Sequence, residues 1–126
     1  MVIGRLSSAA LLLSGVAALV APERVAAALE LSPHSPRGLA ETRAGLGGTY
    51  AALGGWALVS TSPATQVAVG ATWIGAASAR LASLALDRPR TDTAFWAYLA
   101  AEVGFGCLAL GAARAQSRRP SAGGRR

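Results

Sequence analysis

The longest apolar stretch of the chain lies between Arg43 and Arg80, where 36 consecutive residues, Ala44–Ala79, carry no charge. A single helix of that length would rise about 54 Å, whereas the hydrocarbon core of a bilayer is about 30 Å thick. The stretch is interrupted at 60–63 by Ser-Thr-Ser-Pro, a cluster of turn-forming residues that ends in proline. The pattern therefore predicts two membrane-spanning helices, 38–60 and 63–86, joined by a tight hairpin.

Two further apolar segments, 2–20 and 93–113, flank this pair. The sequence thus predicts an all-α fold, a transmembrane four-helix bundle with short connections, over residues 1–115. The first segment leaves a second interpretation open. Arg5 before an apolar run, with small residues at its end, is also the pattern of a cleaved signal peptide.

The connections and the tail are polar. Residues 23–31 are compatible with a short amphipathic helix at the membrane interface, which Pro33 and Pro36 then end. The single histidine, His34, lies between these prolines and is expected to be a solvated loop residue rather than a metal ligand. Residues 116–126 contain mainly Arg, Ser, Gly and Pro and are predicted to be a disordered basic tail.

Composition and charge agree with a membrane protein. The chain is 52% hydrophobic and 14% charged, whereas a soluble domain has about a quarter charged residues. All 12 basic residues are arginine, and five follow residue 113, so the net charge of +6 is mostly a property of the tail. By the positive-inside rule this indicates a multi-pass protein of the cell inner membrane with both termini cytoplasmic, and it does not indicate nucleic-acid binding.

Small residues recur at four-residue spacing inside the predicted spans, which is the pattern of closely packed membrane helices. The faces expected to pack are Gly47, Ala51 and Gly55; Ala71, Gly75 and Ala79; Cys107 and Gly111; and Ala100 and Gly104.

Three charges interrupt the apolar segments: Arg43, Arg80 and Glu102. An ionisable group at depth costs about 2.5–3.5 kcal/mol on insertion scales, so such groups face the protein interior and find partners. All three fall in the outer half of their predicted spans, and Glu102 is predicted to pair with Arg80, Arg43 or both. The further members of this predicted polar cluster are Glu41, Asp87 and Tyr50.

Three interpretations of the polar cluster remain open. The ions can serve only to fix helix register, they can line a pocket that binds a lipid head group or another polar ligand, or they can support proton-coupled transport. The residues offer no catalytic constellation and no metal-ligand cluster, and the single Cys107 excludes an internal disulfide and a cysteine metal cage. No cofactor is therefore expected.

Several motifs resemble a known family. Glu41-Thr42-Arg43 followed by Gly47-Gly48-Thr49-Tyr50 and Leu53-Gly54 is similar to the second-helix signature of small bacterial membrane proteins catalogued as domain-of-unknown-function family 4345. Arg80-Leu81-Ala82-Ser83-Leu84 with Asp87 and Pro89 resembles its third-helix ending, and Glu102 matches its fourth-helix acid. Arg88 departs from the glycine often found there. The resemblance implies a four-helix membrane protein and supplies no activity.

The sequence therefore favours a small integral membrane protein that is a lipid- or ligand-binding module or an accessory subunit. A small transporter, or a membrane enzyme acting on a lipid, is the alternative. The expected partners are membrane lipids, with a larger membrane protein complex or further copies of this chain as other candidates.

Overall fold

The computed structural model describes residues 2–32 and 35–118, and every regular element in these ranges is a helix, as predicted. The elements are α1 (Val2–Val20), α2 (Pro22–Ala28), α3 (Pro36–Thr42), the π-helical η1 (Arg43–Gly48), α4 (Thr49–Val59), α5 (Pro63–Leu86) and α6 (Thr93–Ser117). His34 and residues 119–126 lie outside the described ranges. Within them, the prediction of disorder from residue 116 is wrong for Gln116 and Ser117, which continue α6.

Three of these elements form one continuous helix from Pro36 to Val59. The residues at both internal junctions keep right-handed helical dihedral angles, so the backbone does not break. Between Arg43 and Gly48 the backbone hydrogen bonds join residues five apart instead of four, which widens the helix into a π-turn. The Thr49 hydroxyl follows the same spacing and donates to the Ala44 carbonyl over 3.3 Å. The π-turn thus coincides with the glycine-rich motif of this segment.

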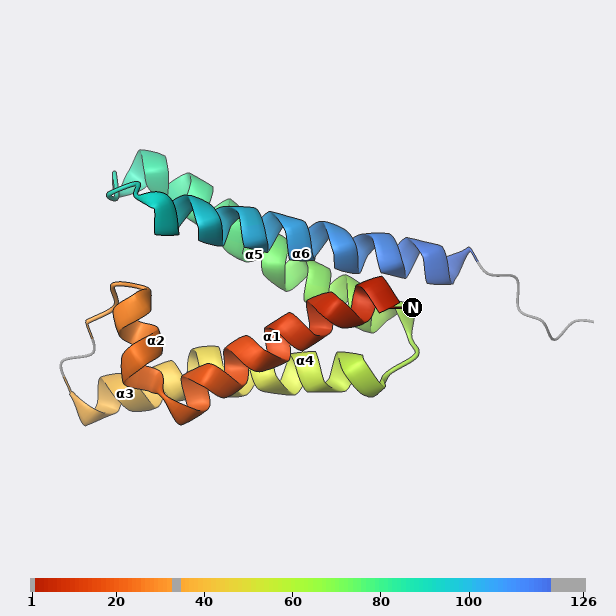
Figure 1. Cartoon of the computed structure of the whole chain (residues 1–126), viewed down its shortest axis with the longest axis horizontal. Helices are drawn as coiled ribbons and strands as arrows, with labels where there is room; N and C mark the ends of the chain where they lie inside the picture. The colour runs from red at the N-terminus through yellow and green to blue at the C-terminus, as the bar shows by residue number, and fades with distance from the viewer. Residues whose placement is uncertain (1, 33–34, 119–126) are drawn as a thin grey trace, which may run out of the picture.

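The long helices associate in two pairs, α1 with α4 and α5 with α6 (Figure 1). The pairs meet at the end where residues 60–62 connect α4 to α5, here called the hairpin end, and they diverge toward the opposite end (Figure 1). The predicted four-helix bundle is not confirmed, because the four helices do not run side by side along their whole length.

The divergent end is bridged by α2. The chain bends by 115° between α1 and α2, so α2 leaves the axis of α1 and approaches the start of α6 (Figure 1). There the Tyr98 hydroxyl donates to the Ala28 carbonyl over 3.3 Å. This hydrogen bond connects the two helix pairs at the end where they are farthest apart.

Glycines set the close approach within each pair. A Cβ added at Gly15 of α1 would lie 2.8 Å from the Ala51 Cα of α4, and one at Gly54 would lie 2.8 Å from the Leu12 Cα. In the other pair, Gly106 of α6 receives the side chain of Ile74. These contacts leave no room for any larger side chain, which is the geometry of helices packed through small residues.

The predicted small-residue faces are only partly correct. Gly47 packs against Leu19, but the faces expected on the last two spans are exposed: Ala71, Gly75 and Ala79 on α5, and Ala100, Gly104, Cys107 and Gly111 on α6. Both helices carry small residues on several sides, and spacing alone does not indicate which side meets a neighbour.

The core is small and the exterior is apolar. Leu11, Val69, Trp73 and Ala109 are among the buried residues that form the core cluster, whereas many large apolar side chains are exposed, including Leu13, Trp56, Val59, Val67, Leu86 and Trp96. Helices α5 and α6 are each long and apolar enough to cross a membrane, and α1 with α2 qualifies as a bent third candidate.

We expect Gly15→Ala to destabilise the protein, because the new methyl group would overlap the backbone of Ala51, and overpacking of this kind costs about 1–3 kcal/mol. Gly75→Ala is the matched control. No atom lies within 4 Å of its added Cβ, and replacing a helical glycine by alanine is neutral or favourable. Thermal unfolding in detergent measures the stability of both variants. Equal stability of the two variants would contradict the close α1–α4 approach.

Candidate functional site

Arg80 of α5 and Glu102 of α6 form a two-pronged ion pair in the divergent half of the protein. The Arg80 Nη2 donates to Glu102 Oε1 over 2.7 Å, and its Nε donates to Oε2 over 3.0 Å. The exposed fraction is 10% for the Glu102 side chain and 24% for that of Arg80. Of the partners predicted for Glu102, Arg80 is therefore confirmed, in the parallel geometry that makes arginine–carboxylate pairs strong.

Two aromatic rings of α6 flank the same guanidinium. The Arg80 Cζ lies 5.5 Å from the ring centroids of both Phe95 and Tyr98. Phe95, Tyr98 and Glu102 are spaced by three and four residues, so they form one stripe along α6 that faces Arg80. The sequence contains this stripe, but the charges alone were singled out there. The helical spacing of two aromatics and an acid was the signal that could have identified it.

The other predicted members of the cluster do not join this ion pair. Arg43 does not contact Glu102, and its Nε instead donates to the Leu19 carbonyl at the end of α1, over 3.3 Å. The predicted three-residue cluster is therefore wrong for Arg43. The reason is tertiary: Arg43 belongs to the helix that pairs with α1, and the two helix pairs diverge at this level.

Glu41 and Asp87 are exposed rather than gathered at the pair. Glu41 lies 3.7 Å from Arg37, and both side chains are largely in contact with solvent. Asp87 ends α5, where its backbone N–H donates to the Ser83 carbonyl. Neither residue forms an ion pair with Arg80 within the described part of the chain.

Tyr50 occupies an aromatic row adjacent to the ion pair. Its ring centroid lies 6.4 Å from that of Trp73 on α5, which in turn lies 5.3 Å from that of Phe105 on α6. This row joins α4 to the other helix pair. The Trp73 Nε1 is buried there without a hydrogen-bond partner among the described residues.

A second polar contact, which the sequence analysis missed, lies toward the hairpin end. The Gln66 side chain, 3% exposed, donates to the Ser8 hydroxyl over 3.2 Å and to the Ala57 carbonyl over 3.4 Å. Nearby, the Ser7 hydroxyl donates to the Phe105 carbonyl over 2.8 Å. These bonds join all four long helices. An amide within an apolar span was the available signal, but it carries no charge and was not singled out.

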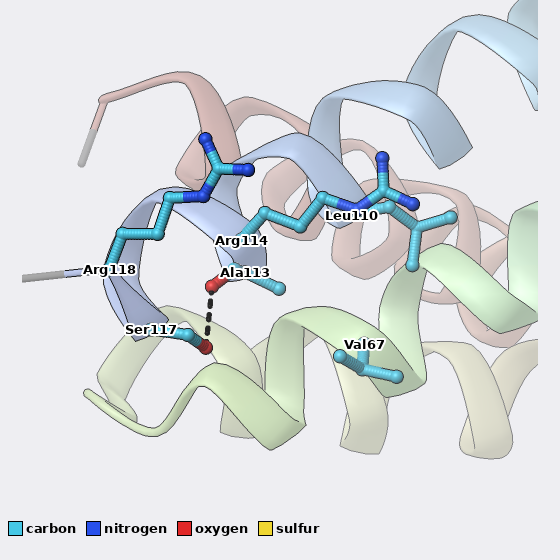
Figure 2. Close-up of a pocket in the computed structure, with 6 residues that line it drawn as sticks. All are labelled: Val67, Leu110, Ala113, Arg114, Ser117 and Arg118. Atoms are coloured by element: carbon cyan, nitrogen blue, oxygen red, sulfur yellow. Dashed lines mark hydrogen bonds between the residues drawn. The ribbon is translucent and has the colours of Figure 1, made fainter.

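The two described cavities also lie at the hairpin end. One, of about 310 Å³, is lined by residues that include Arg5, Gln66 and Gln116, and the other, of about 270 Å³, lies between α5 and α6 (Figure 2). Neither is lined by a member of the predicted polar cluster. In residues 2–32 and 35–118, no group of three or more His, Cys, Asp or Glu side chains is placed to hold a metal ion.

Comparison with known proteins gives a family without a described activity. A family model described as "Domain of unknown function (DUF4345)" matches residues 2–113. No curated protein and no solved structure matches the chain.

We expect Glu102→Gln to lower the free energy of unfolding by on the order of 3 kcal/mol, because it leaves a poorly exposed guanidinium without its counter-charge. Glu41→Gln is the matched control and should change it by less than about 1 kcal/mol, because its ion pair is exposed. Unfolding in detergent is the measurement. The double variant Arg80→Met/Glu102→Met should recover much of the loss, since it removes both charges. Equal effects of the two single variants would contradict a structural role for the pair.

Proposed function

This chain belongs to the DUF4345 family, and because the family description assigns no activity, we propose its function from its geometry. The chain is an integral membrane protein that acts as a non-catalytic binding module for a lipid head group or another anionic ligand, with Arg80 at the centre of the binding region. Its four long helices span the cell inner membrane, and both termini are cytoplasmic.

The membrane assignment is supported by where apolar and ionised groups lie. Helices α5 and α6 have the length and hydropathy to span a bilayer, and large apolar side chains cover the exterior. The carboxylate of Glu102, the only acid within these helices, is turned inward and paired. An ionised group that faces the protein interior and finds a partner is the arrangement expected in a lipid environment.

The observation that carries the binding role is the set of donors that Arg80 retains. A guanidinium has five N–H donors, and the two hydrogen bonds to Glu102 leave three without a partner among the described residues. Its side chain keeps a 24% exposed surface beside Phe95 and Tyr98, near the divergent end of the helix pairs. An acceptor group with negative charge would satisfy these donors, and the flanking rings would exclude water from them.

The depth of the site agrees with a head group that enters from the outer leaflet. Arg80 lies six residues before the end of α5 at Leu86, which corresponds to about 9 Å along the helix axis. The basic tail beyond α6 supports a cytoplasmic hairpin end by the positive-inside rule, in which case the divergent end would face outward.

The membrane assignment is tested by extraction. We expect the full chain to remain with the membrane fraction after alkaline carbonate washing and to be released only by detergent, because its exposed apolar side chains need contact with lipid or detergent rather than water. A peripheral protein of the same cells serves as the control and should be released by carbonate. Recovery of this chain as a soluble monomer without detergent would overturn the assignment.

The binding role is tested by retained lipid. We expect Arg80→Gln to remove one native anionic lipid per chain from the protein purified in mild detergent, counted by mass spectrometry, because losing a hydrogen bond to a charged group, about 1.5–3 kcal/mol, weakens that site about tenfold or more. Arg90→Gln, at the same end but in an exposed loop, should have little effect. Arg80→Lys keeps the charge and should retain part of the lipid. Unchanged lipid in folded Arg80→Gln would contradict the proposal.

A further inference from the structure

A second region with binding chemistry lies at the hairpin end, on the outside of the α5–α6 pair. A cavity of about 270 Å³ lies between the start of α5 and the last turns of α6, and Figure 2 draws the residues that line it. Its lining consists of Val67 from α5 and of Leu110, Ala113, Arg114, Ser117 and Arg118 from α6 and its end. None of these residues belongs to the region around Arg80.

The lining separates into an apolar floor and a cationic rim. Val67 and Leu110 form the floor, and the guanidinium groups of Arg114 and Arg118 lie on one side of α6 (Figure 2). The Ser117 hydroxyl is already engaged, since it donates to the Ala113 carbonyl over 3.1 Å. The two guanidinium groups are therefore the donors that remain for a ligand.

The two arginines have no counter-charge in the described part of the chain. The ion pairs there are Arg37–Glu41 and Arg80–Glu102. All six acidic residues lie between positions 23 and 102, and Glu102 itself is 12 residues before Arg114, about 18 Å along the helix. The end of the helix dipole favours cations at this position, but it does not neutralise them. An anionic partner from outside the chain would neutralise the two guanidinium groups.

In the proposed membrane placement, this cavity lies at the level of the lipid head groups. Helix α6 has 25 residues and is about 37 Å long, somewhat more than the hydrocarbon core, so its last turn reaches the head-group region. The floor residues are one to two turns deeper than the rim, where acyl chains begin. A ligand with a charged head and an apolar chain matches both parts of the lining.

We propose that this cavity binds an anionic phospholipid of the cytoplasmic leaflet. Arg114 and Arg118 donate hydrogen bonds to the phosphate, and the start of an acyl chain lies along Val67 and Leu110. The inference rests on the proposed membrane placement and does not depend on ligand binding at Arg80. A free phosphate would offer the same anionic group, but it would leave the apolar floor uncovered.

The test uses the full chain in neutral detergent, titrated with phosphatidylglycerol or with phosphatidylcholine of equal chain length, and counts bound lipid by native mass spectrometry. We expect Arg114→Gln/Arg118→Gln to weaken phosphatidylglycerol binding about 25-fold, since each arginine near a membrane surface contributes a factor of about five. Arg5→Gln is the matched control. It removes one positive charge at the same end, as Arg114→Gln or Arg118→Gln does alone with an expected loss of about fivefold. Arg5 lines the other cavity, so its effect should be less than about twofold.

Val67→Trp tests the floor without changing the charge. It should also weaken phosphatidylglycerol binding, because the indole would fill the groove. The proposal is overturned if Arg5→Gln weakens binding as much as Arg114→Gln or Arg118→Gln alone, since the attraction would then be diffuse. It is also overturned if phosphatidylcholine binds equally well, or if inorganic phosphate competes fully and Val67→Trp has no effect. Because Arg80 is itself proposed to bind an anionic head group, Arg80→Gln and Arg114→Gln/Arg118→Gln should each remove one bound phosphatidylglycerol and the triple variant two. Loss at one site without loss at the other separates the failure of this inference from the failure of the proposed function.

Discussion

The ion pair between Arg80 and Glu102 is the constraint on which the divergent half of this protein depends. Ionised groups in an apolar helical protein must be compensated within it, and these two residues compensate each other through two parallel hydrogen bonds. Because one residue is on α5 and the other on α6, the pair also fixes the rotation of the two helices relative to each other. The stripe of Phe95 and Tyr98 beside Arg80 follows from that rotation.

The two ends of the protein are held together by different kinds of contact. At the hairpin end, neutral groups form the links between helix pairs, with Gln66 bonded to Ser8 and to the Ala57 carbonyl. At the divergent end, the Tyr98–Ala28 hydrogen bond joins the pairs through the short helix α2. Tyr98 thus contacts Arg80 with its ring and α2 with its hydroxyl, so the position of α2 is coupled to the ion pair.

Charge is distributed unevenly along the same axis. The acidic residues lie between positions 23 and 102, whereas Arg5, Arg114 and Arg118 lie at the hairpin end without a carboxylate among the described residues. In a membrane this asymmetry orients the chain and attracts anionic lipid to one leaflet. The proposed ligand of Arg80 and the proposed phospholipid therefore belong to opposite surfaces, and the protein would contact both leaflets through arginine.

The sequence by itself determined the all-helical fold, the turn at 60–63 and that Glu102 pairs with an arginine of a neighbouring span, because hydropathy and turn residues act locally and an unpaired charge in an apolar span is costly. Only the tertiary structure decided that Arg43 lies apart from Glu102. It also decided which small residues pack, since Gly15 and Gly54 meet a neighbour whereas Gly75 and Gly104 do not. Helix spacing defines the faces of each helix, but the crossing of the helices selects among them, and that crossing depends on contacts summed over the whole chain.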